Sequence, residues 1–188
     1  MKTRILTLVA LFVFATVSTA VAQNKKINMK ESKVTWTGYK VTGQHEGTID
    51  FKDGKLEFKD GKLVGGMFTI DMNTINTTDL SGDYKNNLDG HLKSDDFFGV
   101  AKFPTATLTF KKVVETDDNV YRVAADLEIK GSKSRVAFDI ELESNSAEAK
   151  LKVDRTKFGI KYGSASFFDG LKDKAISDEF DLKVELKF

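Results

Sequence analysis

The sequence predicts an all-β protein, a single antiparallel barrel of about eight strands with a short helical segment over one end. Most of the chain after residue 22 alternates apolar and polar residues with a period of two, turn signals separate the alternating segments, and residues 77–98 lack that period. Such alternation is typical of antiparallel strands with one face in water. With hardly any helix to cover the apolar face, the strands must form a sandwich or a closed barrel, and a barrel also removes exposed edges.

The first 22 residues have the pattern of a cleaved signal peptide. A basic start and an apolar run over residues 5–17 precede small residues at 20–22, where a signal peptidase would cut. The alternative is an N-terminal membrane anchor, although the run is short for a membrane span. The chain has no cysteine, which excludes a lipobox lipoprotein and disulfides. We therefore expect a signal peptide over residues 1–22, one domain over 23–188, and a periplasmic or secreted location.

The charge balance of the domain argues against nucleic acid as a partner. The chain has 29 basic and 28 acidic residues, and the first 22 residues hold two of the basic ones and no acidic one, so residues 23–188 carry a formal charge of −1. Binding to phosphate backbones needs a basic excess on one face. The domain is long enough for one hydrophobic core and short for two.

Alternating segments identify the strands and their inward faces. The clearest segments are residues 34–37, 68–72, 106–110, 121–129, 136–142, 149–153 and 180–188. Turn signals are Asp53-Gly54, Asp60-Gly61 and Asp118-Asn119. The predicted interior set is Trp36, Phe68, Ile70, Leu108, Phe110, Leu127, Ile129, Phe138, Ile140, Leu182 and Val184. Because a barrel of about eight strands is either filled by side chains or holds one small ligand, these residues form an ordinary core or a binding lumen.

Residues 77–98 are predicted to form one or two helical turns across an end of the barrel. Leu88 and Leu92 are four residues apart, as on one face of a helix. Phe97 and Phe98 follow this segment and can either plug the barrel mouth or line it, whereas Phe103, next to Pro104, is biased toward extended backbone and the core. Adjacent residues in a helical turn point about 100° apart, so we expect at least one of the pair to contact a ligand.

Three stretches resemble blocks of a known family. Residues 90–98 (GHLKSDDFF), 127–131 (LEIKG) and 154–159 (DRTKFG) are similar to blocks of the YceI family, exported lipocalin-like barrels that bind long isoprenoid or related lipid chains. The resemblance implies a lipid such as a polyisoprenoid or an isoprenoid quinone in the lumen, and it points to His91. Leu88 stands where many members have arginine, and Glu128 where many have threonine. The missing arginine favours a neutral or weakly polar head group over a pyrophosphate.

The expected ligand-binding residues combine the inward faces with the helical segment. They are Trp36, His45, Phe68, Ile70, Leu88, His91, Leu92, Phe97, Phe98, Phe110, Leu127, Ile129, Phe138 and Phe158. We expect His45 and His91 to lie together at the mouth near the ligand's polar head, with Arg155 as the basic candidate. A buried methylene contributes roughly 0.8 kcal/mol, so a long chain binds with few polar contacts. A homodimer and a transient membrane contact are compatible with this prediction.

Two other classes of function stay open at this point. A metal-dependent enzyme could use His45 and His91 with Asp89 or Asp95, although no closely spaced ligand pair is present. A haem could be held by His91 or Tyr162, and a protein-binding surface module would need no cavity. The chain has no cysteine, no Gly-x-Ser-x-Gly elbow and no phosphate-binding glycine loop. We therefore expect no enzymatic activity, no metal site and no cofactor other than the bound lipid.

Overall fold

The computed structural model describes residues 22–188, so the predicted signal peptide over residues 1–22 lies outside the described residues except for Ala22. The strands are β1 Ala22–Lys26, β2 Lys33–Lys40, β3 Gly43–Lys59, β4 Lys62–Thr77, β5 Thr105–Asp117, β6 Val120–Ile129, β7 Ser132–Leu142, β8 Ser146–Asp154 and β9 Ile176–Lys187. The helices are α1 Gly82–Lys93 and two 3-10 turns, η1 Arg155–Phe158 and η2 Lys172–Lys174. Within residues 22–188 no helix is long and apolar enough to cross a membrane.

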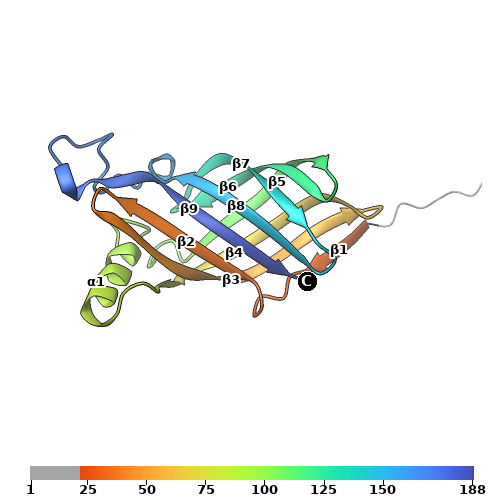
Figure 1. Ribbon diagram of the computed structural model, residues 1–188, viewed down its shortest axis with the longest axis horizontal. Coiled ribbons are helices and arrows are strands. Elements are labelled where there is room, and N and C mark those ends of the chain that lie inside the picture. Colours follow the sequence, from red (N-terminus) through yellow and green to blue (C-terminus); the bar gives the residue numbers. More distant parts are fainter. Residues whose placement is uncertain (1–21) are drawn as a thin grey trace, which may run out of the picture.

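Eight strands close into an antiparallel barrel, and β1 is added outside the ring. The strand order is β1-β3-β2-β9-β8-β7-β6-β5-β4, and pairing of β3 with β4 closes the ring formed by β2 to β9. β1 pairs with the end of β3, from Ala22 opposite Lys59 to Lys26 opposite Lys55. The helix α1 and the loop that contains η2 lie at one end, and the C-terminus and β1 lie toward the other (Figure 1). The structure confirms the predicted all-β barrel with a short helical segment over one end.

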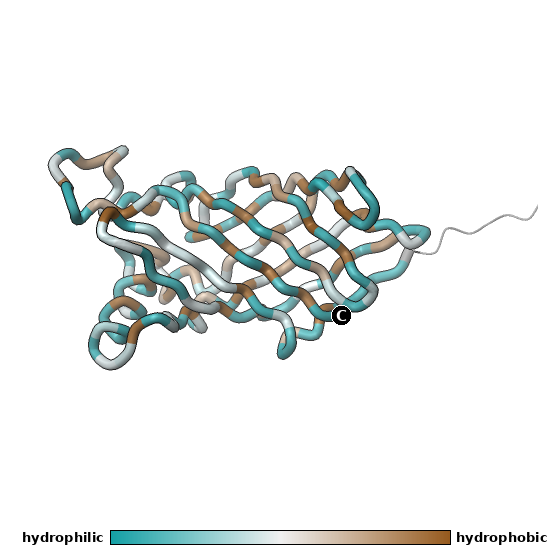
Figure 2. Tube along the Cα trace, in the orientation of Figure 1, coloured by the Kyte–Doolittle hydropathy of each residue, from teal (hydrophilic) through white to brown (hydrophobic). Residues whose placement is uncertain are grey.

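The alternation read from the sequence gives the correct register. All eleven residues of the predicted interior set belong to the core or pack against it: Phe68, Phe110, Leu127, Ile129, Phe138 and Ile140 are buried, and Trp36, Ile70, Leu108, Leu182 and Val184 are partly buried. Apolar and polar positions alternate along the strands (Figure 2). A shift of one residue would have reversed every side chain, so this agreement fixes the register.

A stack of phenylalanine rings fills the barrel interior in the half away from α1. Ring centroids are 5.9 Å apart for Phe51 and Phe68, 5.9 Å for Phe68 and Phe110, and 5.7 Å for Phe110 and Phe138. Gly66 allows this packing, because a Cβ there would lie 2.9 Å from the Phe110 ring. These tilted and edge-on contacts are the geometries that aromatic rings prefer.

One predicted turn is wrong, and two are confirmed. β3 runs without interruption through Asp53-Gly54, where the register shifts between Phe51 and Asp53 as in a β-bulge. Gly54 lies against Phe68 there, and a Cβ would come within 2.7 Å of that ring, so a close approach and not a hairpin requires the glycine. The turns at Asp60-Gly61 and Asp118-Asn119 do separate strands, and Asp60, Gly61 and Asn119 have positive φ. β3 is not among the strands predicted from the sequence, because the bulge breaks its alternation of apolar and polar residues.

The helix α1 is fastened to the barrel by a carboxylate. Asp89 accepts hydrogen bonds from the backbone N–H of Thr77 at 2.8 Å and from the hydroxyl of Thr77 at 2.7 Å, and it also pairs with Lys85. Burial acts to raise the pKa of Asp89, but the hydrogen bonds from Lys85 and Thr77 outweigh it and lower that pKa. None of the α1 residues is buried, so this polar contact positions the helix over the barrel end.

Candidate functional site

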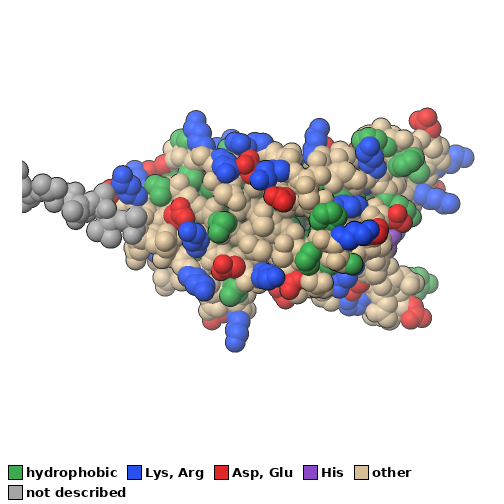
Figure 3. Space-filling view, turned by 180° about the vertical axis from the view of Figure 1, so that it is seen from behind, with side chains coloured by type: hydrophobic (Ala, Val, Ile, Leu, Met, Phe, Trp, Pro, Cys, Tyr) green, Lys and Arg blue, Asp and Glu red, His purple; other side chains and the backbone are tan. Residues whose placement is uncertain are grey.

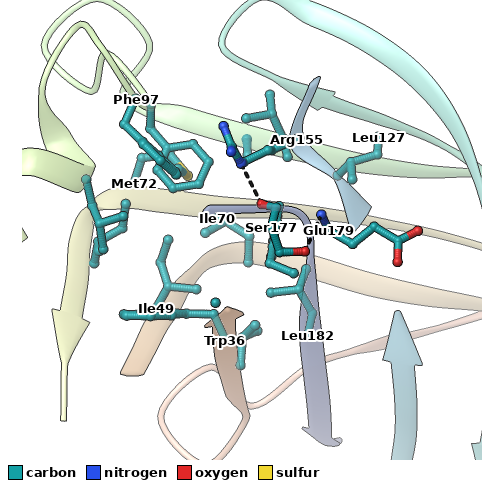
Figure 4. A pocket seen from close by; sticks show the side chains of 18 of the residues that line it. Trp36, Ile49, Ile70, Met72, Phe97, Leu127, Arg155, Ser177, Glu179 and Leu182 are labelled. Atoms are coloured by element: carbon teal, nitrogen blue, oxygen red, sulfur yellow. Dashed lines mark hydrogen bonds between the residues drawn. The ribbon is translucent and has the colours of Figure 1, made fainter. Parts of the chain in front are cut away.

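A cavity of about 140 Å³ lies inside the barrel, in the half nearest α1. Its wall combines β2, β3, β4, β5, β6 and β9 with the end of α1, the turn after it and the first residue of η1. Apart from Gly38, Tyr39, Arg155, Ser177 and Glu179, every lining residue is apolar. Side chains from several strands, among them those of Trp36, Ile49 and Leu182, surround one common space (Figure 4).

Half of the expected ligand-binding residues line this cavity. They are Trp36, Ile70, Leu92, Phe97, Phe98, Leu127 and Ile129. The walls are held in place by neighbouring backbone. The indole N–H of Trp36 donates to the carbonyl of Thr48 at 3.3 Å. Gly47 leaves room for the Trp36 ring, because a Cβ at Gly47 would lie 2.5 Å from it.

The other seven expected residues lie elsewhere. Phe68, Phe110 and Phe138 belong to the ring stack that fills the other half of the barrel, so they form packed core and not cavity wall. Phe158 is buried in η1, outside the cavity. His45, Leu88 and His91 do not line it either. Alternation predicts which residues of a strand face the interior. Whether an inward residue lines a cavity or belongs to the packed core depends on the side chains that surround it.

Residues that the sequence reasoning missed come from two sources. Ile49 lies on β3, whose alternation is hidden by its bulge, and Val34 and Met72 belonged to predicted strands but were not selected. Ile176 and Phe180 lie at the start of β9, where the strand passes beside a bulge opposite Gly38 and Lys40. The alternation of residues 180–188 predicts that Phe180 faces the interior, but Ile176 lies before this segment and could not be predicted from it.

Arg155 lies in the cavity wall and is hydrogen-bonded through all three of its nitrogens. Only 2% of the residue is exposed. Its Nε donates to the carbonyl of Ser177 at 2.9 Å, its Nη1 to that of Ile160 at 2.9 Å, and its Nη2 to that of Ile176 at 3.0 Å. Figure 4 shows the bond from Arg155 to Ser177 at the edge of the cavity. Three of the five N–H groups are therefore used, two to join η1 to the start of β9 and one to hold the loop after η1.

One carboxylate and one aromatic ring lie close to the guanidinium of Arg155. Its Nη2 lies 3.6 Å from Oδ1 of Asp178, and its guanidinium carbon lies 5.6 Å from the centre of the Phe97 ring. Burial lowers the pKa of Arg155, and Asp178 partly offsets that effect. Burial acts to raise the pKa of Asp178, but hydrogen bonds from Ser164 and Ser166 and the charge of Arg155 outweigh it and lower that pKa. Arg155 thus supports Phe97 and the cavity edge.

A chain of aromatic contacts closes the cavity at its α1 end. The Phe97 and Phe98 ring centroids are 5.0 Å apart, and Phe98 lies 6.4 Å from Phe180 across the opening. His91 contacts Phe97 at 5.6 Å and Tyr162 at 4.4 Å on the outer side. Both phenylalanines line the cavity, so they act as its cover. Phe103, expected in the core, is half-buried against Gly131.

His45 and His91 have different partners and neither lines the cavity, so their contact with a ligand's polar head stays a prediction. Nδ1 of His45 lies 2.8 Å from Oδ2 of Asp79, whose other oxygen accepts from the N–H of Glu46. Burial acts to raise the pKa of Asp79, but the His45 and Glu46 hydrogen bonds outweigh it and lower the pKa. His91 contacts the rings of Phe97 and Tyr162, and its Nε2 is buried without a hydrogen-bond partner in the described part of the chain.

The carboxylates that could have completed a metal site have other partners. Asp89 is bound to Thr77 and Lys85, and Asp95 pairs with Lys102 at 2.6 Å. Among residues 22–188, no group of three histidine, cysteine, aspartate or glutamate side chains is placed to hold a metal ion. What the geometry of the cavity can do is enclose an apolar group behind Phe97 and Phe98.

A family model and several solved structures match nearly the whole described chain. A family model described as YceI-like domain matches residues 25–188. The solved structure of BcnA from Burkholderia cenocepacia is similar with a TM-score of 0.70 and 22% sequence identity, covering 85% of this chain and 98% of that one. A polyisoprenoid binding domain from Saccharophagus degradans has a TM-score of 0.57 and 15% identity, covering 86% and 95%. At these identities the two structures show a shared fold.

A curated relative matches part of the chain by sequence. A UPF0312 protein of Staphylococcus aureus strain USA300 is 33% identical over 88 residues, which cover 41% of this chain and 48% of that protein. The chain thus spans about half the length of the curated relatives it matches.

Proposed function

Because the chain belongs to the YceI family over residues 25–188, we propose that its barrel binds a long-chain isoprenoid or a related lipid and carries or stores it in the periplasm or outside the cell. The observation that carries this proposal is the cavity of about 140 Å³ with almost entirely apolar walls. A protein of the same fold is described as a polyisoprenoid binding domain. The signal-peptide pattern of residues 1–22 supports the location.

The cavity size indicates how a long chain would be held. A cavity of about 150 Å³ accommodates a ring the size of benzene, so about 140 Å³ suits roughly one isoprene-sized unit. A longer chain therefore has to leave the cavity between Phe98 and Phe180 or displace the Phe97 and Phe98 rings. Burying about ten methylenes would contribute roughly 8 kcal/mol, equivalent to micromolar affinity before the cost of ordering the chain.

The polar groups at the cavity edge favour a neutral or weakly polar head. Arg155 donates to three backbone carbonyls, and the Tyr39 hydroxyl donates to Asp181 at 2.7 Å. The remaining polar residues are Ser177 and Glu179, and the exposed Glu179 carboxylate lies 3.7 Å from Nζ of Lys152, so within residues 22–188 the edge offers no free cationic group to an anion. With Leu88 where many family members have arginine, an isoprenoid quinone or alcohol fits better than a pyrophosphate. The same reasoning favours a binding protein over an enzyme.

Extraction and rebinding test this function. We expect protein purified without detergent to release a long-chain isoprenoid or related lipid into organic solvent, seen by mass spectrometry, and the delipidated protein to rebind a long-chain isoprenoid alcohol or quinone. An extract without lipid, together with no rebinding, would overturn the proposal. Metal analysis of the same sample separates the enzyme alternative, because a stoichiometric metal ion would contradict a pure lipid-binding role.

A further inference from the structure

Within residues 22–188, the large aromatic side chains that are exposed all lie at the α1 end of the barrel. The exposed fractions are 80% for Tyr84, 48% for Tyr162, 46% for Phe167 and 50% for Phe168. Tyr84 lies in the first turn of α1, and the others lie in the loop between η1 and β9 (Figure 1). We call these four residues the aromatic rim. The large exposed residues toward the opposite end, such as Val64, Met67 and Val114, are not aromatic.

The loop of the rim is an ordered structure that presents its rings outward. The N–H groups of Phe167 and Phe168 donate to the carbonyl of Ser164 at 3.2 and 3.0 Å, and Ser164 is fully buried. The N–H of Ile176 donates to the carbonyl of Gly163 at 2.8 Å and closes the loop at its base. Because the backbone is fixed in this way, the exposure of the two rings is a feature of the fold. Adjacent exposed aromatics of this kind mark an interaction surface.

Lysines accompany the exposed rings. Residues 157–174 contain four lysines and two aspartates, Asp169 and Asp173. Nζ of Lys161 lies 4.6 Å from the centre of the Phe167 ring. In the part of the chain that the structure describes, no ion pair engages Lys161, Lys172 or Lys174. Figure 3 shows hydrophobic and basic side chains together with several acidic ones at the right-hand end of the molecule.

Aromatic rings beside lysines match the surface of an anionic bilayer. Aromatic side chains prefer the boundary between head groups and acyl chains, and each nearby lysine is attracted by anionic lipids. We propose that the aromatic rim docks on an anionic phospholipid bilayer, with Phe167 and Phe168 in the interfacial layer and Lys161, Lys172 and Lys174 at the head groups. The same loop leads directly into Ile176 and Phe180 of the cavity wall.

Docking in this orientation would bring the cavity cover next to the membrane. Phe98 and Phe180 face each other at the cavity's α1 end, beneath the rim. A lipid chain could then pass between bilayer and barrel without crossing water. This role in lipid exchange rests on the proposed lipid binding, whereas the docking itself depends only on the rim.

Vesicle flotation tests the docking with the full mature protein. The probe is a vesicle of phosphatidylglycerol and phosphatidylcholine, compared with phosphatidylcholine alone. We expect the wild type to float with the anionic vesicles, and the double variant Phe167→Ser, Phe168→Ser to bind at least about tenfold more weakly. The matched control, Val64→Ser with Val114→Ser, removes exposed apolar groups at the other end and should bind within about twofold of the wild type.

Further measurements separate docking from its alternatives. The variant Lys161→Gln, Lys172→Gln, Lys174→Gln should lose about tenfold or more on anionic vesicles, as should the wild type in high salt. The proposal fails if the wild type does not float, if the serine variants of rim and control bind alike, or if light scattering shows that the rim variant turns a dimer into a monomer. Lipid extraction is the independent readout. If the wild type contains lipid but does not float, membrane docking is contradicted and lipid binding is not. If the wild type floats but contains no lipid, lipid carriage is contradicted and docking is not.

Discussion

The two halves of the barrel are filled in different ways. Away from α1, the rings of Phe51, Phe68, Phe110 and Phe138 pack in series at 5.9, 5.9 and 5.7 Å and leave a solid core. Toward α1, the same strands surround a cavity of about 140 Å³. The change occurs within a few residues, since Phe68 is followed on β4 by Ile70, and Phe110 is preceded on β5 by Ala106.

This comparison shows where the capacity to bind originates. Both halves have the same alternation, the same closure and the same antiparallel pairing. In the solid half the rings of Phe51, Phe68, Phe110 and Phe138 pack on one another, whereas in the hollow half the inward side chains leave a space between them, and Phe97 and Phe98 cover its end from outside the sheet. A binding lumen thus arises from how the inward side chains pack and from one loop, on a barrel with the same strand pairing throughout.

The largest expected effect is the loss of a ring from the solid half. Phe110→Ala removes a ring that contacts both Phe68 and Phe138, and truncating a buried phenylalanine costs about 3–5 kcal/mol of unfolding free energy. Urea unfolding followed by circular dichroism measures this loss. We expect the lipid content per folded molecule to stay unchanged, because Phe110 does not line the cavity. A cost under about 1 kcal/mol would mean that this half is not solidly packed.

A matched pair of enlargements compares the halves directly. Ala125 is fully buried and pairs with Phe110, so Ala125→Leu should cost about 1–3 kcal/mol through overpacking. Ala106 lines the cavity, so Ala106→Leu should cost less than about 1 kcal/mol and should lower lipid retention by filling the space. Thermal unfolding and lipid extraction of both variants measure these effects. Equal destabilisation by the two substitutions would contradict the division of the barrel into a solid and a hollow half.

The sequence was sufficient for the fold and for the inward faces, but not for the boundary between the halves. Alternation depends on a period of two, which any pleated strand shows, so Phe68 and Ile70 look equivalent in the sequence. Whether an inward residue lines a cavity depends on what packs opposite, such as Gly66 opposite the Phe110 ring. Arg155 was expected as a head-group contact, yet its donors are taken by backbone carbonyls of residues that are distant in the sequence.

The cover of the cavity can be tested residue by residue. Phe98 is half-buried and faces Phe180 across the opening, so Phe98→Ala should weaken lipid retention about tenfold and cost roughly 1 kcal/mol of stability. Phe97 is 7% exposed and supports both His91 and Arg155, so Phe97→Ala should lose lipid and also destabilise the fold by about 2–3 kcal/mol. Retention is measured by extraction after gel filtration. Full lipid content in both variants would show that these rings are not the cover.

The smallest expected effect is a pH dependence at the hollow end. The pKa of Asp89 is lowered in the folded protein, so its stabilisation of α1 is present above the unfolded value of about 4 and is lost as the pH falls below it. Protonation removes the charge that pairs with Lys85 and weakens the two hydrogen bonds from Thr77, each worth about 1 kcal/mol, so acid should loosen α1 before the solid half unfolds. Hydrogen exchange of the α1 amides between neutral pH and pH ~3.5 measures this loosening.

Two variants decide whether Asp89 is the cause. Asp89→Asn keeps an oxygen that can accept from Thr77 but loses the charge that pairs with Lys85, so the α1 amides should exchange faster at neutral pH and respond less to acid. Asp139→Asn is the matched control, because Asp139 also has a lowered pKa through Arg122 but lies exposed on the outer face of β7. An exposed ion pair contributes at most about 1 kcal/mol, so this control should leave α1 exchange unchanged. If both variants shift α1 alike, acid acts on the net charge of the barrel and not on the contact that holds the helix over the cavity.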